Sequence, residues 1–127
     1  MRRALILIIT LSLLSFGSGA ALDTLQRRTA QQYLQWLDSL RTLIVQENLR
    51  EAENREMQLR ARWQHDARWL NCMISHHHTR DVSSALLHLA TALEMGWQKE
   101  ALLAADEAVD ALEEIRDADF LAWENIL

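Results

Sequence analysis

The chain has 127 residues, a length that suits one domain and is too short for two domains of ordinary size. Hydrophobic residues make up 50% and charged residues 24%, which is the balance of a folded protein and not of a disordered tail. The sequence has no proline, and Gly96 is the only glycine outside the N-terminal segment. A single cysteine excludes a disulfide framework and a four-cysteine zinc site. The composition also excludes a glycine-rich phosphate loop and predicts an all-α protein.

Residues 1–22 have the pattern of an export signal or a membrane anchor. Arg2 and Arg3 precede Ala4–Leu22, which is a run of 19 residues without a charge. Such a run falls within the roughly 17 to 25 residues that span a bilayer. Small residues at Ser18 and Ala20 would instead allow cleavage after Ala20. Both interpretations stay open, and both place a single domain over residues 23–127 outside the cytoplasm, either secreted or membrane-anchored.

Charge is distributed unevenly along the chain. The formal net charge is −5, and it becomes −7 when Arg2 and Arg3 are left out. Residues 81–127 hold only Lys99 and Arg116 against eleven acids. Because an acidic exterior repels phosphates, no nucleic-acid partner is expected. The acidic last helix favours a basic protein partner, the alternative being a merely solvated face. Its candidate residues are Asp106, Glu107, Asp110, Glu113, Glu114 and Asp117.

Apolar residues recur at helical spacing in four stretches. They are, in order, Tyr33, Trp36, Leu37, Leu40 and Ile44; Ala52, Leu59, Trp63, Leu70, Ile74 and His77; Val82, Leu86, Leu89 and Leu93; and Ala101, Ala105, Ala108, Leu112, Ile115, Ala122, Trp123 and Ile126. Asn48 is the expected turn or cap residue after the first stretch, and Gly96 is the expected end of the third. The pattern predicts an antiparallel four-helix array made of two helical hairpins, with Trp63 in the core.

The two predicted hairpins are similar at an offset of 49 residues. Leu37, Leu40 and Ile44 align with Leu86, Leu89 and Leu93, and Arg50–Ala52 aligns with Lys99–Ala101. An internal duplication would explain this similarity, as in stacked tetratricopeptide-like units. Chance similarity between short amphipathic helices is the alternative, and the sequence leaves both open.

Several positions together resemble a known family. They are Trp63, Trp69, Met73, Ile74, His77, Asp81 and the C-terminal Glu-Asn-Ile-Leu, which includes Asn125. With the export segment and the chain length, they resemble domain-of-unknown-function family 4363 from Met1 onward. The resemblance implies a small, exported or membrane-anchored helical protein of bacteria. It implies no activity.

Histidine and cysteine are the residue types that could carry unusual chemistry. His65, Trp69, Cys72 and His76 have the spacing that puts them on one side of a continuous second helix. Cys72 and His76, with His65 nearby, are therefore candidate metal ligands. A stable site needs three or four ligands from more than one helix, and His76, His77 and His78 diverge by about 100° per residue. We therefore expect no metal and no cofactor, and Cys72 is either buried or available for an intermolecular disulfide.

The remaining candidates favour packing and contact roles. His77 and Asp81 form an i, i+4 pair if the helix continues, or a contact at a junction if it breaks near Ser75 to Arg80. Capping or packing is the favoured role in both cases, because no nucleophile or second acid at helical spacing completes a catalytic site. Trp36, Trp63, Trp97 and Trp123 are predicted in the core, and Trp69 is predicted as an exposed contact residue. The sequence thus predicts a non-enzymatic structural or protein-interaction module at the cell envelope. The alternative is a helical bundle that binds a metal or small ligand.

Overall fold

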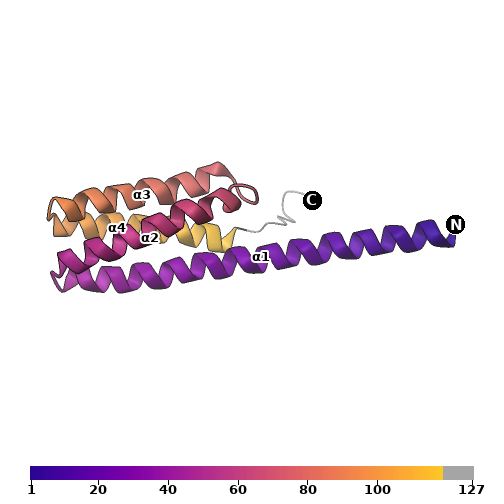
Figure 1. The fold of residues 1–127 in the computed structure, drawn as a ribbon, viewed down its shortest axis with the longest axis horizontal. Coiled ribbons are helices and arrows are strands. Elements are labelled where there is room, and N and C mark those ends of the chain that lie inside the picture. The colour runs from indigo at the N-terminus through magenta and orange to yellow at the C-terminus, as the bar shows by residue number, and fades with distance from the viewer. Residues whose placement is uncertain (119–127) are drawn as a thin grey trace.

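The protein is a four-helix bundle with one greatly extended helix. The computed structural model describes residues 1–118, which form α1 (Arg2–Val45), α2 (Leu49–Leu70), α3 (His76–Glu94) and α4 (Gln98–Asp117). Each helix packs against the next, and α4 returns to pack against α1, so the bundle closes with antiparallel neighbours (Figure 1). This confirms the predicted all-α array of two hairpins. The predicted inward positions Ala122, Trp123 and Ile126 lie outside the described residues, as does Asn125.

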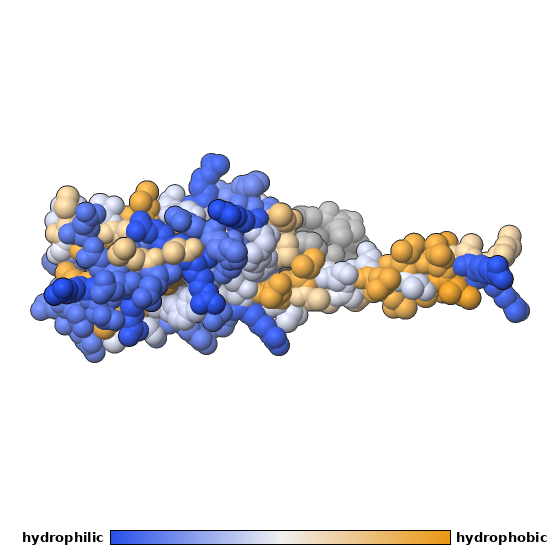
Figure 2. Space-filling model, viewed as in Figure 1, coloured by the Kyte–Doolittle hydropathy of each residue, from blue (hydrophilic) through white to orange (hydrophobic). Residues whose placement is uncertain are grey.

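The N-terminal part of α1 stands clear of the bundle. Its apolar side chains are exposed from Leu5 to Phe16, and they form the orange projection in Figure 2. Among residues 1–118, α1 is the one helix long and apolar enough to cross a membrane. Gly17 and Gly19 do not interrupt it, so the apolar segment and the first bundle helix are one continuous rod.

The two hairpins turn through the same backbone motif. Glu47 and Gly96, which are 49 residues apart, have φ of 62° and 72°. After α1, the amide of Asn48 donates to the Leu43 carbonyl at 3.0 Å, and after α3 the amide of Trp97 donates to the Ala92 carbonyl at 2.8 Å. Both are Schellman turns, in which a left-handed residue lets the last helical carbonyls find donors. The aligned positions therefore have the same backbone structure, and Asn48 is the N-cap of α2 as predicted.

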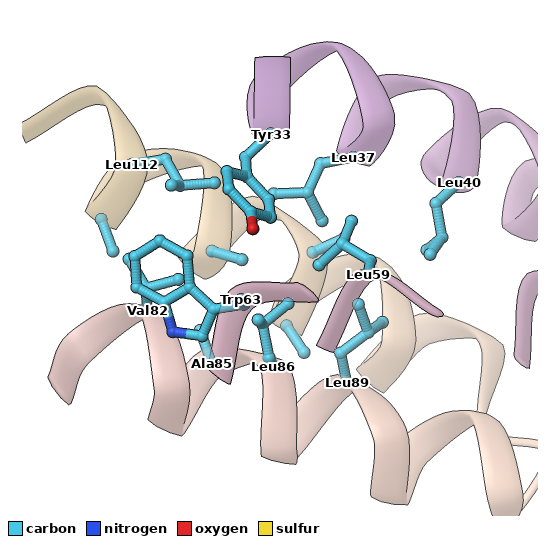
Figure 3. Close-up of a cluster of buried hydrophobic side chains, with 14 of the residues drawn as sticks. Tyr33, Leu37, Leu40, Leu59, Trp63, Val82, Ala85, Leu86, Leu89 and Leu112 are labelled. Carbon is cyan, nitrogen blue, oxygen red and sulfur yellow. The ribbon is translucent and has the colours of Figure 1, made fainter. Parts of the chain in front are cut away.

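The core is centred on two aromatic side chains from neighbouring helices. Trp63 of α2 and Tyr33 of α1 are almost fully buried, and their rings meet edge to face with centroids 5.3 Å apart (Figure 3). Leucines from α1 and α3 surround them, including Leu37 and Leu86. Tyr33 Oη donates to Asp66 Oδ2 at 2.5 Å, and burial and this contact raise the pKa of the tyrosine. The predicted core position of Trp63 is confirmed.

Glutamine side chains join α1 to α4 at both ends of their contact. Gln26 of α1 is fully buried, and its Nε2 donates to the Ile115 carbonyl in the last turn of α4 at 2.8 Å. Gln98 of α4 donates in turn to the Ile44 carbonyl of α1 at 2.9 Å. Carbonyls in the last turn of a helix lack intrahelical partners, so Gln26 supplies a donor to the Ile115 carbonyl, while Gln98 adds a second donor to the Ile44 carbonyl, which already accepts from the Glu47 amide.

The second helix ends earlier than its apolar spacing predicts. α2 stops at Leu70, and α3 begins at His76 after Ser75, whose Oγ accepts a hydrogen bond from the His77 amide. The apolar spacing of Leu70, Ile74 and His77 was misleading because Ile74 belongs to the turn. The prediction that His77 lies on the buried stripe is wrong, since 73% of its side chain is exposed on α3.

Candidate functional site

An acidic groove follows the contact between α3 and α4. These helices approach closely because alanines fill their interface, among them Ala85 on α3 and Ala104 and Ala108 on α4. The groove has a volume of about 450 Å³. It is lined by Asp81, Ser84, Ala85, His88, Glu107, Asp110, Ala111 and Glu114. Four carboxylates and two alanines thus face a single shallow depression.

Two histidines lie beside carboxylates of this groove. His88 Nδ1 lies 3.3 Å from Glu107 Oε2, and its Nε2 lies 3.5 Å from Glu100 Oε2. His78 Nδ1 lies 3.7 Å from Glu114 Oε2. No ion pair joins Asp110 to any other residue in the described part of the chain. The carboxylate of Asp110 is therefore the best-placed group to receive an external cation.

The six predicted acidic residues of the last helix do not share one face. α4 lies between α1 and α3, and Asp106 points to α1, where its Oδ1 is 3.0 Å from Arg41 Nε. Asp117 pairs with its neighbour Arg116, which lowers the pKa of the Asp117 carboxyl. Glu113 is half-buried. Only Glu107, Asp110 and Glu114 face the groove, and α3 adds Asp81.

His77 and Asp81 form the predicted i, i+4 pair. His77 Nε2 lies 3.3 Å from Asp81 Oδ2, and both side chains are accessible to solvent. Asp81 also lines the acidic groove, so this pair adjoins it. Its geometry fits a local surface contact between neighbouring turns of α3.

The predicted metal ligands are separated by the break between α2 and α3. His65 is on α2, Cys72 is exposed in the turn and His76 is the first residue of α3, so the shared helical face does not exist. Among residues 1–118, no three histidine, cysteine or acidic side chains are grouped closely enough to hold a metal ion. The Cys72 thiol instead lies 3.7 Å from the Arg68 carbonyl.

Two tryptophans differ from their predicted environments. Trp69 is half-buried against the core, and its Nε1 donates to Asp66 Oδ1 at 3.3 Å. Trp97, predicted in the core, is 55% exposed at the α3–α4 turn. The reason is that Trp97 follows Gly96 and is the N-cap of α4, outside the helical spacing that carries the buried stripe.

A second groove, of about 510 Å³, lies between α1 and α2. Arg62 lies over the ring of Trp36 on its wall, 5.0 Å from the centroid, and Arg55 pairs with Glu51 at 3.4 Å. The charged groups on this wall therefore have partners within the chain, unlike Asp110.

Glu56 is a buried charged residue that the sequence analysis missed. It lies between Ala52 and Leu59 on the inner side of α2 and is 1% exposed. Burial raises the pKa of Glu56, and Arg60, whose Nε is 3.2 Å from Glu56 Oε1, lowers it by less. The spacing of Ala52, Leu59 and Trp63 does indicate an inward position here, so the pattern held a signal that the residue type concealed.

The family profile that matches this chain covers residues 24–126 and carries the description "Domain of unknown function (DUF4363)". The chain belongs to the DUF4363 family. The match begins where α1 leaves its apolar segment, so the family domain includes the whole described bundle. No curated protein and no solved structure matches the chain. The predicted family is confirmed, and the family description assigns no activity.

Proposed function

We propose that this DUF4363 protein is a membrane-anchored, extracytoplasmic interaction module. The observation that supports it is the continuity of α1, whose exposed apolar half runs without a break into a polar bundle. Exposure of such an apolar helix to water is unfavourable, whereas a bilayer would bury its apolar side chains. Arg2 and Arg3 at its start favour a cytoplasmic N-terminus and an external bundle.

We also propose a binding role and not a catalytic one. The acidic groove between α3 and α4 offers Asp110 and its neighbours to a lysine- or arginine-rich protein surface. Electrostatic attraction of this kind accelerates association and selects partners by charge. No second function is proposed, because Cys72, His76 and His65 are not grouped as ligands.

The location is tested with a reporter that is active only outside the cytoplasm, fused after Leu127. We expect activity, and a fusion active only in the cytoplasm would contradict the proposal. Mass measurement of the purified protein then distinguishes the two open interpretations of residues 1–22. An intact N-terminus supports the anchor, and a chain that begins at Ala21 indicates a cleaved signal.

The binding surface is tested by proximity labelling on intact cells. The variant Asp110→Lys reverses the charge in the groove, and Asp38→Lys, on the exposed side of α1, is the matched control. We expect Asp110→Lys alone to lose labelled basic neighbours. Equal loss in both variants, or in neither, would contradict a specific role of the groove.

A further inference from the structure

The length of α1 fixes the height of the bundle above a membrane. Ala4–Leu22 has 19 residues and spans about 28 Å as a helix, close to the roughly 30 Å of bilayer hydrocarbon. Gln26, which donates to the Ile115 carbonyl, marks where α4 meets α1. Gln26 is four positions after Leu22, which corresponds to a rise of about 6 Å along the helix. That is about the depth of one headgroup layer, so the end of the bundle lies among lipid headgroups.

The α2–α3 turn lies at this same end. Figure 1 shows it at the end of the bundle from which α1 projects, whereas the other two turns lie at the far tip. Hydrogen bonds tie the turn to the ends of both helices, since the Thr79 hydroxyl donates to the Asn71 side chain and the Met73 and Ile74 amides both donate to the Leu70 carbonyl at 2.9 Å. The turn therefore lies against the same end of the bundle as the start of α3 and the end of α2.

Side chains around this end suit an interface between water and lipid. Met73, Ile74 and Trp69 are half-buried and expose part of their surface at or beside the turn. A tryptophan with an indole N–H and an apolar ring is the residue type enriched at headgroup level. Figure 2 shows pale and orange residues where the bundle meets α1, between the blue bundle surface and the apolar projection.

Three arginines at this end lack partners within the described chain. No ion pair joins Arg28 of α1, Arg68 of α2 or Arg80 of α3 to any of residues 1–118. Of the carboxylates near this end, Asp23 pairs with Arg27 and Asp117 with Arg116. The others also have contacts that do not involve these three arginines: Asp66 accepts a hydrogen bond from Tyr33, Asp81 and Glu114 lie beside His77 and His78, and Glu113 lies near Arg116.

We propose that this end of the bundle, defined by Arg28, Arg68, Arg80, Trp69, Met73 and Ile74 and called the membrane-proximal surface, binds the phosphate headgroups of anionic phospholipids. A guanidinium group can donate two parallel hydrogen bonds to the oxygens of one phosphate. The apolar part of an arginine side chain can lie along the interface while its charged end reaches the phosphates. The proposal rests on the proposed membrane anchoring of α1. In this arrangement the long axis of the bundle is roughly perpendicular to the membrane, with the membrane-proximal surface against the lipid.

Cys72 provides the test, because it is the only cysteine and lies exposed in the turn. The full-length protein is spin-labelled there and reconstituted in phosphatidylcholine vesicles with or without phosphatidylglycerol. Accessibility to oxygen, which concentrates in lipid, is compared with accessibility to a water-soluble nickel chelate. The reference label is Met95→Cys at the far tip and the anchor label is Ser12→Cys, both in a Cys72→Ser background.

We expect the Cys72 label to be severalfold less accessible to the nickel chelate than the tip label. This difference should be larger in vesicles that contain phosphatidylglycerol. The combined variant Arg28→Gln, Arg68→Gln and Arg80→Gln should abolish the effect of phosphatidylglycerol, while Arg50→Gln, at the far end of α2, should not. Circular dichroism checks that each variant is folded.

The outcomes separate this proposal from the proposed anchoring. A Cys72 label as accessible to nickel as the tip label, with the Ser12→Cys label inside the hydrocarbon, overturns the membrane-proximal surface and leaves the anchor standing. A Cys72 label that lies at the interface but whose accessibility is the same with and without phosphatidylglycerol overturns the recognition of anionic lipid. A water-exposed Ser12→Cys label overturns the anchor and this proposal together.

Discussion

Trp63 is the largest of the fully buried side chains in the described part of the chain. It is 1% exposed, meets Tyr33 edge to face and donates from Nε1 to Ser83 Oγ at 2.9 Å. Trp63 projects from α2 toward side chains of α1 and α3 (Figure 3), so truncation of the indole would leave a cavity bordered by several helices. Partial collapse around such a cavity is what makes large-to-small substitutions costly.

We expect Trp63→Ala to lower the free energy of unfolding by about 3 to 5 kcal/mol, most of the stability of a domain of this size. The measurement is urea unfolding followed by circular dichroism, which does not depend on the removed fluorophore. Trp97→Ala is the matched control and should cost less than about 1 kcal/mol, as expected of an exposed residue. A loss below that value for Trp63→Ala would show that the side chain does not stabilise the core.

Glu56 should make stability depend on pH in a direction opposite to that of an ordinary paired carboxylate. Burial raises the pKa of Glu56 above its usual 4.5, so the folded state binds a proton more readily than the unfolded state. Its favourable contribution is fully present below pH 4.5 and is lost as the pH rises through the raised value.

Glu56→Gln removes that charge at nearly constant shape, and we expect it to stabilise the protein at neutral pH by about 1 kcal/mol. The gain should shrink as the pH falls through the raised pKa and below 4.5, where the wild-type carboxyl becomes neutral in both states. The measurement is urea unfolding across that pH range. Glu51→Gln removes an exposed carboxylate that pairs with Arg55, and its effect should stay within about 0.5 kcal/mol. A constant difference at all pH values would refute the assignment to Glu56.

At the scale of elements, the two hairpin turns form a natural comparison. Glu47 and Gly96 occupy the same left-handed position of the same turn, but only glycine takes that conformation without a steric penalty. An added Cβ at Gly96 would meet no atom within 4 Å, so any cost of a substitution there comes from the backbone.

We therefore expect opposite effects from two substitutions. Glu47→Gly should raise, and Gly96→Ala should lower, the free energy of unfolding, each by about 1 kcal/mol. Thermal and urea unfolding of the two single variants test this, and their combination shows whether the turns are coupled through Ile44, whose carbonyl accepts from Glu47 and from Gln98. Destabilisation by Glu47→Gly would show that the Glu47 side chain makes a contribution larger than its backbone strain.

At the scale of the whole molecule, the separation of Cys72, His76 and His65 by the α2–α3 break bears on zinc binding. We expect reduced, purified protein to bind zinc with micromolar or weaker affinity and its melting temperature to change little, since a ligand near its dissociation constant stabilises weakly. Isothermal titration and thermal unfolding measure the two quantities. A nanomolar complex lost on Cys72→Ser or His76→Ala would instead favour a metal-binding bundle.

The sequence alone was sufficient for the helical fold, the apolar segment and most of the core. Tyr33, Leu37, Leu86 and Leu89 recur at helical spacing, and a one-sided apolar stripe can be buried only against other helices. Gly96 marked its turn because no side chain opposes positive φ there. Family membership also followed from sequence, and it is now supported by the match over residues 24–126.

Features set by neighbouring helices depended on the tertiary structure. The exact position of the α2–α3 break did not follow from the sequence, because Ile74 and His77 continue the spacing of Leu70, and only the packed bundle shows that they leave the second helix. The acids of α4 looked like one face in the sequence. Their division between Arg41 on one side and His88 and His78 on the other arises from the position of α4 between two helices. Gln26 and Glu56 are polar residues that the bundle buries. Helical spacing predicts which side of a helix a residue lies on, but the groups that it contacts there depend on the neighbouring helices.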